Sequence, residues 1–225
     1  SKVYELNTKS KKRLNFEDKL PLVLFEPEHM RLLTGSPELR RTFLDELLTE
    51  TSPSYSKELN GYKRALMQRN KLLKNNYQDP DQLFVWNIRL SELAGQIVSA
   101  RLTAINDINE QITDIYSQIS DKKTAIKLSY LSKINLKNYQ SDMLRQLEKN
   151  TELDFLRGFT GVGPHREDVA VDIRNQPASV AASRGETRTL VLSLKVIEKQ
   201  FIELARGTKP IILLDDVFSE LDGSR

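Results

Sequence analysis

The chain has 225 residues, of which 39% are hydrophobic and 29% are charged, and its formal net charge is +3. This composition is ordinary for a globular protein and argues against overall disorder. No apolar run approaches 18 residues and the start is polar, so we expect a cytoplasmic protein with no membrane partner. The absence of cysteine and the two isolated histidines leave no disulfide framework and no recognisable zinc site.

The first part of the chain is predicted to supply strands and then a helix. Residues 3–6 and 22–25 have the character of β-strands, and the polar stretch 7–13 between them forms either a hairpin turn or a loop. From Pro37 the apolar residues recur every three or four positions, which predicts a helix. The segment Thr51-Ser52-Pro53-Ser54 interrupts this helix before a second one begins.

Two long helices follow, with apolar stripes at residues 55–77 and 86–119. The second stripe continues through about nine turns, so we expect the two helices to pair antiparallel in a coiled-coil-like arm roughly 50 Å long. The expected architecture is therefore α/β, with a partial, mixed-sheet head and an inserted helical arm. The arm would occupy residues 37–150, between head segments at 1–36 and 151–225.

The remaining elements are expected to return the chain to the head. In chain order they are a strand at 124–131, an amphipathic helix at 139–156, a glycine-rich loop at 158–164, a strand at 169–173, a turn at 175–178, a helix at 185–205 and a buried strand at 211–214.

The segment Ser183-Arg184-Gly185-Glu186 opens the helix at 185–205 and admits two interpretations. Serine followed three residues later by glutamate is a capping box, which stabilises a helix without any ligand. The same helix end presents unpaired N–H groups and a positive dipole, and Gly185 lets a ligand approach closely. These features suit a phosphate, and both interpretations stay open here.

Asp215 and Asp216 follow four aliphatic residues, which places carboxylates at the C-terminal end of a buried strand, where α/β sheets collect ligands. One could hold Mg²⁺ through water and the other could orient a water that attacks a phosphate. For an isolated Asp-Asp pair we would favour a turn cap. The following Ser219-Glu220-Leu221-Asp222 favours the nucleotide interpretation. No glycine in the chain precedes lysine, so the phosphate-cradling loop of such a site is missing.

A basic run is the candidate DNA-binding surface, although a solvated helix face is the ordinary explanation of such a run. Its residues are Lys57, Lys63, Arg64, Arg69, Lys71 and Lys74. Arg166 in Gly163-Pro164-His165-Arg166 is a further candidate, but a structural turn is the favoured interpretation there. Arg40 and Arg41 are expected to pair with Asp45 or Glu46 on the same helix.

In order along the chain, Ser-Arg-Gly-Glu, the aliphatic strand ending in Asp-Asp, and Ser-Glu-Leu-Asp resemble the signature motif, Walker B segment and D-loop of ABC-type ATPases. Within that superfamily the chain is most similar to the RecF family of bacterial DNA recombination and repair ATPases. The resemblance extends to the segments at 25–30, 35–45 and 162–166, and so covers nearly the whole chain. The missing phosphate loop and the chain ends suggest a fragment.

The resemblance implies a function and roles for individual residues. Family members sandwich ATP and Mg²⁺ between two heads, so an ATP-dependent homodimer is implied. The chain would belong to an ATP-dependent protein that binds double-stranded DNA and gapped junctions, helps recombinase loading, and has RecR and RecO as partners. The implied nucleotide contacts are Ser183, Arg184, Gly185, Glu186, Ser219 and Asp222, with Asp215 on the Mg²⁺ side and Asp216 as catalytic acid. RecF proteins usually carry Gln in place of Glu186.

Two other hypotheses stay open. In the first, the chain is a head-and-arm scaffold whose nucleotide motifs are vestigial, which also explains the missing phosphate loop. In the second, it is a Rad50-like or SMC-like head, which needs a much longer arm than residues 37–150 supply. By itself, the chain is predicted neither to bind nor to hydrolyse ATP.

Overall fold

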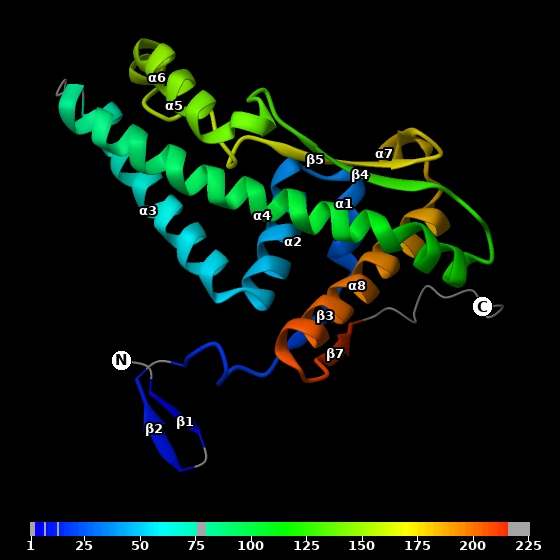
Figure 1. Cartoon of the computed structure of the whole chain (residues 1–225). Coiled ribbons are helices and arrows are strands. Elements are labelled where there is room, and N and C mark those ends of the chain that lie inside the picture. Colours follow the sequence, from blue (N-terminus) through cyan, green and yellow to red (C-terminus); the bar gives the residue numbers. More distant parts are fainter. Residues whose placement is uncertain (1–2, 7, 13, 76–79, 216–225) are drawn as a thin grey trace.

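The computed structural model describes residues 3–6, 8–12, 14–75 and 80–215. Figure 1 shows one long helix, α4 (Pro80–Ser120), crossing the molecule. Helices α2 (Pro37–Thr51) and α3 (Pro53–Lys74) lie on one side of it, and α5 (Tyr139–Lys149) lies on the other. The remaining helices are η1 (Pro27–Met30), α1 (Arg31–Thr34), η2 (Leu136–Asn138), α6 (Thr151–Arg157), α7 (Ala178–Ala181) and α8 (Arg184–Arg206).

The described strands form three small sheets. They are β1 (Tyr4–Leu6), β2 (Lys9–Lys11), β3 (Leu22–Phe25), β4 (Ile126–Leu131), β5 (Asp168–Ile173), β6 (Gln176–Pro177) and β7 (Ile211–Leu214). β1 and β2 form an antiparallel hairpin, β3 pairs in parallel with β7, and β4, β5 and β6 form an antiparallel sheet in that order. The hairpin therefore joins the first predicted strand to residues of the polar stretch 7–13, whereas the second predicted strand, β3, pairs with β7 instead. The hairpin lies away from the helices (Figure 1).

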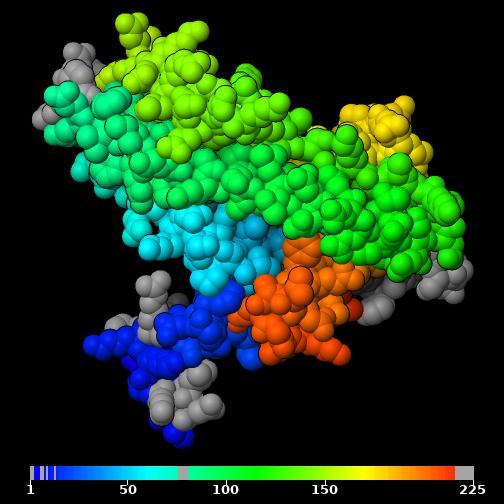
Figure 2. Space-filling view, in the orientation of Figure 1, coloured from blue at the N-terminus to red at the C-terminus, as the bar shows by residue number. Residues whose placement is uncertain are grey.

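Helix α4 carries the core of the molecule. Its 41 residues correspond to about 61 Å at 1.5 Å per residue. Leu90, Ile97, Ile108 and Ile112 have no exposed surface, as the predicted apolar stripe requires. Helix α3 packs along α4 in the opposite direction, as expected (Figure 1). Figure 2 shows α4 as a green band across the upper part of the molecule, above the blue N-terminal segment and the orange α8.

Local sequence signals explain where the helices begin and end. The Ser52 hydroxyl accepts a hydrogen bond from the Tyr55 N–H at 3.3 Å, and Pro53 occupies the first turn of α3. The single helix predicted at 139–156 is wrong, because α5 and α6 divide at Asn150. Its side-chain amide donates to the Gln146 carbonyl at 2.7 Å, a local bond that competes with continued helix.

Helix α4 also protects the free edge of strand β4. The Asn109 side chain donates to the Leu128 carbonyl at 2.9 Å and accepts from the Leu128 N–H at 2.7 Å. One turn later, the Thr113 hydroxyl makes the same two kinds of contact with Ile126. These side chains supply the hydrogen bonds that a neighbouring strand would make, so the edge is closed to further pairing and the long helix is held against the sheet.

None of the helices within the described ranges is both long enough and apolar enough to cross a membrane.

Candidate nucleotide-contacting site

The N-terminus of α8 is a capped helix end at the protein surface. The Ser183 hydroxyl accepts from the Glu186 N–H at 3.2 Å, and the Glu186 carboxylate accepts from the Ser183 N–H at 2.8 Å, so the predicted capping box is present. This box leaves the first-turn N–H groups of Arg184 and Gly185 for a ligand. A side chain built at Gly185 would meet nothing within 4 Å, so the approach to these groups is open.

The Glu186 carboxylate is also held by a cation from another element. Arg174, in the turn between β5 and β6, donates from Nη1 to Glu186 Oε1 at 2.5 Å. This guanidinium, followed by the Ser183 N–H, lowers the pKa of Glu186 to about 2. Glu186 is therefore ionised at neutral pH. Its carboxylate is paired with Arg174 and hydrogen-bonded to the Ser183 N–H of the helix cap.

The rest of α8 is firmly seated in the core. Leu190, Val191, Leu194 and Ile197 are at most 1% exposed, and the helix contacts both α2 and α4. Gly207 ends it with a left-handed backbone at φ 64°. A helix with one face buried over this length holds its N-terminus in a fixed position relative to α4, which is the property that a phosphate-contacting helix end needs.

The prediction that residues 211–214 form a buried strand is wrong in its burial, because the four residues of β7 are 47–52% exposed. Asp215 follows this strand directly and is also exposed. Its N–H donates to the Phe25 carbonyl at 2.9 Å, which continues the parallel pairing of β3 and β7 by one residue. The strand runs back in the direction opposite to α8 (Figure 1). The other predicted residues of this part, Asp216, Ser219 and Asp222, lie outside the described residues.

Most of the predicted basic surface is exposed on α3. Lys57, Lys63, Arg64, Lys71 and Lys74 all project from this helix into solvent. Part of the same surface is a shallow hollow of about 520 Å³. Its lining residues are Lys63, Leu66, Met67, Asn70, Lys71, Lys74 and Asn75.

Arg166 lies in the turn at residues 163–166, which packs against Tyr62 of α3. Its guanidinium stacks on the Phe159 ring at 4.7 Å from the ring centroid. Gly158, the neighbour of Phe159, packs against the stem of Lys74. The segment that carries Phe159 and Arg166 therefore runs beside α3.

The prediction that Arg69 belongs to the basic surface is wrong. Arg69 has no exposed surface, and its Nη1 donates to Asp154 Oδ2 and to the Thr160 hydroxyl, each at 2.7 Å. Its Nε donates to Asn87 at 2.7 Å. The sequence did contain the signal, because Arg69 falls seven residues after Tyr62 on the apolar stripe of α3 and so faces the core.

The expected pairing of Arg40 and Arg41 within their own helix is also wrong. Arg40 forms a two-bond ion pair with Asp168 at the start of β5, at 2.8 and 2.9 Å. Arg41 donates to the Glu167 carbonyl. Asp45 is taken instead by Arg101 of α4, at distances from 2.8 to 3.0 Å.

The Gly163-Pro164-His165-Arg166 segment forms the favoured turn, with the Arg166 N–H donating to the Gly163 carbonyl at 2.9 Å. His165 belongs to no metal cluster, since the described residues contain none. Its Nδ1 lies 2.7 Å from the Tyr62 hydroxyl. Burial lowers the pKa of His165 to about 4, so the ring is neutral at pH 7.

Sequence reasoning missed a buried polar network that joins α4 and α5 to the β4–β5 sheet. The Glu167 carboxylate accepts from the hydroxyls of Tyr130, Ser132 and Tyr139 at 2.6 to 2.7 Å. Arg101 donates to the Tyr130 hydroxyl at 3.1 Å and thereby joins this cluster to Asp45. Such a network fixes the relative position of helix and sheet because every broken contact would leave a buried polar group unpaired.

Comparisons with known proteins place these features in a family context. No protein-family model matches the chain. Proteins named "DNA replication and repair protein RecF" are similar to it: those of Clostridium beijerinckii and Streptococcus pyogenes M49 are 38% and 39% identical, and each match covers 91% of this chain. The Clostridium perfringens protein is 34% identical over 205 residues. The chain spans 56% to 57% of the length of these relatives.

Solved structures agree with the sequence comparison. The recombination mediator protein RecF of the RecFOR pathway, solved with ATPrS, superimposes with a TM-score of 0.89 at 30% identity, over 99% of this chain and 62% of its own. The structure with ATP gives 0.88 at 28% identity. These matches confirm the predicted α/β fold of an ABC-type ATPase head with a helical arm. Sequence and fold together identify this chain as a relative of the RecF proteins, of whose length it spans a little more than half.

Proposed function

We propose that the chain belongs to an ATP-dependent DNA-binding protein of recombinational repair and replication-fork maintenance. In this proposal the full-length protein is an ABC-type ATPase that dimerises around ATP, grips duplex DNA near single-strand gaps and helps recombinase loading. The similarity to RecF proteins over 91% of the chain supports it. The proposed partners RecR and RecO rest on the RecFOR pathway named for the similar structures.

The observation that carries the proposal is the α8 N-terminus. Its first-turn N–H groups lie at the surface beside an unobstructed glycine, while the rest of the helix is locked in the core. A helix end of this kind binds an anion, and phosphate is the anion that ATP presents. Because the end is exposed, the phosphate would be one held by a second head. We assign Ser183, Arg184, Gly185 and Glu186 to this contact between subunits.

The residues of the described part also suit a magnesium nucleotide. Asp215 is exposed at a strand end, and no cluster of three metal-ligating side chains exists among the described residues. Mg²⁺ bound here would take most of its ligands from water and from phosphate, as this ion commonly does. When bound, it would neutralise charge on the transferred phosphate. We assign Asp215 to a water-mediated contact, Asp216 to the orientation of the attacking water, and Ser219 and Asp222 to the dimer seam.

We propose that DNA binds to the exposed basic surface of α3 and to Arg166. Phosphate contacts need only positive charge on an accessible face, and these side chains meet that requirement. The buried Arg69 is excluded from this surface. The polar network around Glu167 joins the arm that bears these cations to the sheet that leads to Arg174 and the α8 N-terminus.

The proposal is tested by a substitution that blocks the helix end and leaves the fold intact. Gly185→Glu in the full-length protein places a negative side chain in open space where the phosphate would bind. The matched control is Gly185→Ala, which adds only a methyl group and favours the helix. We expect ATP with Mg²⁺ to dimerise the wild type and the control, but not Gly185→Glu, in sedimentation velocity. A wild type that stays monomeric with ATP contradicts the proposal and favours a scaffold.

A further inference from the structure

We infer that Arg174 is a positioning residue for the nucleotide contact at the α8 N-terminus, which it makes compatible with phosphate by holding the Glu186 carboxylate back on the helix cap. This inference rests on the proposed function. The proposed function places a glutamate beside a phosphate-binding helix end, and a free carboxylate there would repel the phosphate. The ion pair with Arg174 removes this repulsion.

The geometry around Arg174 supports a dedicated clamp. Nη1 donates to Glu186 Oε1 at 2.5 Å, and Nη2 donates to the Ala181 carbonyl at 2.9 Å. The guanidinium thus bridges the glutamate and the end of α7, the element that precedes the capped serine. The Arg174 N–H in turn donates to the Ala125 carbonyl at 2.9 Å, which ties the turn to the residue before β4.

The backbone of this turn aims the side chain. Arg174 and Asn175 both have left-handed backbones, with φ of 54° and 59°, as a two-residue hairpin between β5 and β6 requires. Such positive φ values are uncommon for residues other than glycine, and asparagine adopts them more readily than arginine. An arginine in the first position therefore needs a compensating interaction, and its contacts with Glu186 and Ala181 provide one.

The Glu186 carboxylate takes part in both the helix cap and the ion pair with Arg174. Glu186 Oε2 accepts the Ser183 N–H at 2.8 Å and a longer contact from Arg174 Nη2 at 3.5 Å, whereas Oε1 accepts from Arg174 Nη1 at 2.5 Å. The cap bond and the shortest Arg174 bond therefore use different carboxylate oxygens. The N–H groups of Arg184 and Gly185 are left for the phosphate. Glutamine at position 186 could accept the same cap bond without a charge, and then Arg174 would have no charge to neutralise.

This reasoning predicts a specific double-mutant cycle in the full-length protein. The proteins are wild type, Arg174→Ala, Glu186→Gln and the double variant, each measured for the dimer dissociation constant at fixed ATP and Mg²⁺. Arg174→Ala should weaken the dimer by about four- to twenty-fivefold, since an exposed charge interaction changes affinity about two- to fivefold and a symmetric dimer holds two such sites. In the Glu186→Gln background the same substitution should change little.

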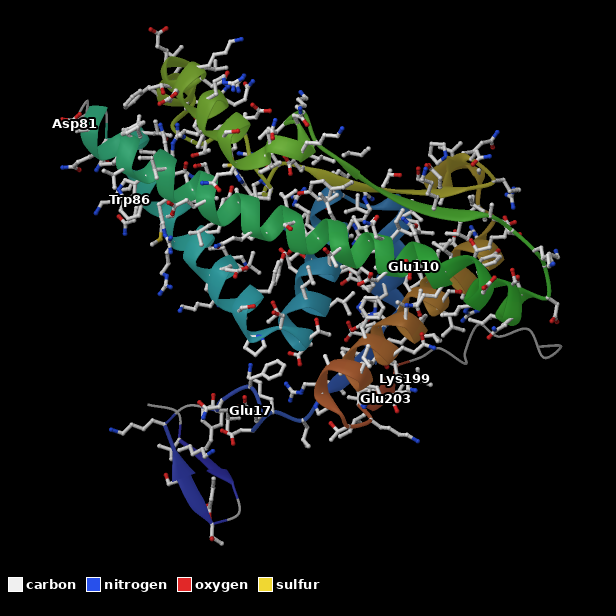
Figure 3. The ribbon with its side chains drawn as sticks, in the orientation of Figure 1. Glu17, Asp81, Trp86, Glu110, Lys199 and Glu203 are labelled. Atoms are coloured by element: carbon white, nitrogen blue, oxygen red, sulfur yellow. The ribbon has the colours of Figure 1, made fainter. Side chains whose placement is uncertain are left out.

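A matched control removes one partner of another, half-buried ion pair on the same helix. Lys199 pairs with Glu203 at 2.6 Å, and both lie toward the C-terminal half of α8 (Figure 3). Lys199→Ala should leave the dimer unchanged. A second readout needs no nucleotide: the pKa of the Glu186 carboxyl, followed by NMR, should rise in Arg174→Ala from its low wild-type value of about 2.

The outcomes separate the inference from the function on which it rests. If the wild type dimerises with ATP but Arg174→Ala has no effect, or has the same effect in both backgrounds, the inference is wrong and the proposed function stands. An unchanged Glu186 pKa in Arg174→Ala also overturns the inference. If the wild type does not dimerise with ATP, both fail together.

Discussion

Replacing Arg69 tests the most deeply buried ion pair in the described structure. Arg69 and Asp154 are 0% and 1% exposed, and Arg69 makes three side-chain hydrogen bonds, to Asp154, Thr160 and Asn87. In Arg69→Met the aliphatic volume is largely kept, but Asp154 Oδ2 loses its cation while Oδ1 keeps the Gly161 N–H at 3.0 Å. Removing one partner of a buried pair leaves an uncompensated charge, so we expect a loss of about 3–5 kcal/mol in the free energy of unfolding.

A second variant distinguishes lost charge balance from lost packing. Asp154→Asn keeps an acceptor for the Gly161 N–H but carries no charge. The double variant Arg69→Met with Asp154→Asn should therefore recover a measurable part of the stability that Arg69→Met loses. The control is Lys71→Met on the exposed face of the same helix, for which we expect a change within about 0.5 kcal/mol.

Urea denaturation measures these differences directly. Trp86 is the single tryptophan of the chain and precedes Asn87, a partner of Arg69, so its fluorescence reports on this region beside circular dichroism (Figure 3). If Arg69→Met is as stable as Lys71→Met, Arg69 is not buried in solution, and its exclusion from the DNA-binding surface would be wrong.

Four further predictions follow from other parts of the structure. The pKa of His165 is about 4 in the folded protein and 6.5 when the chain is unfolded, so between these pH values the unfolded chain binds more protons. The free energy of unfolding should therefore be highest above pH 6.5 and should fall by about 2–3 kcal/mol as the pH is lowered to 4. In urea titrations at several pH values, a His165→Gln variant with the same pH dependence would contradict this assignment. Asn109→Ala leaves the backbone N–H and carbonyl of Leu128 unpaired. The free energy of unfolding should fall by about 2 kcal/mol, and hydrogen exchange at the Leu128 amide should become faster. Unchanged exchange would mean that the strand edge does not depend on Asn109. In a plot of the logarithm of the duplex DNA binding constant against the logarithm of the salt concentration, Lys57→Ala and Arg64→Ala should each make the slope less steep by about 0.9. Unchanged slopes would remove this face from the proposed DNA site. The 225-residue chain by itself should show no ATP turnover, since it contains no Gly-Lys phosphate loop; turnover abolished by Asp216→Asn would refute this.

Features encoded within a few neighbouring residues could be predicted from the sequence. The capping box of Ser183 and Glu186, the start of α3 at Ser52 and Pro53, and the apolar stripe of α4 each depend on spacing along a single helix. The division of the helix at Asn150 was missed because amphipathic spacing continues across it, and only a local side-chain bond marks the break.

The partners of the charged residues could not be predicted, because they come from distant segments. Arg41 has Asp45 four residues later, at helical spacing, and nevertheless donates to the Glu167 carbonyl, 126 positions away. Arg174 meets Glu186 only because a hairpin turn lies beside the start of α8. A sequence shows which charges are present, whereas the packing of sheets and helices decides which of them meet and which are buried.

The most direct test of the proposed function is ATP-dependent DNA binding by the full-length protein beside its Asp216→Asn variant, measured at a stated salt concentration. The account predicts that ATP tightens duplex binding by the wild type and that the variant, unable to hydrolyse ATP, stays trapped on DNA. If ATP changes the DNA affinity of neither protein, the nucleotide motifs have only a structural role and the proposed function is contradicted.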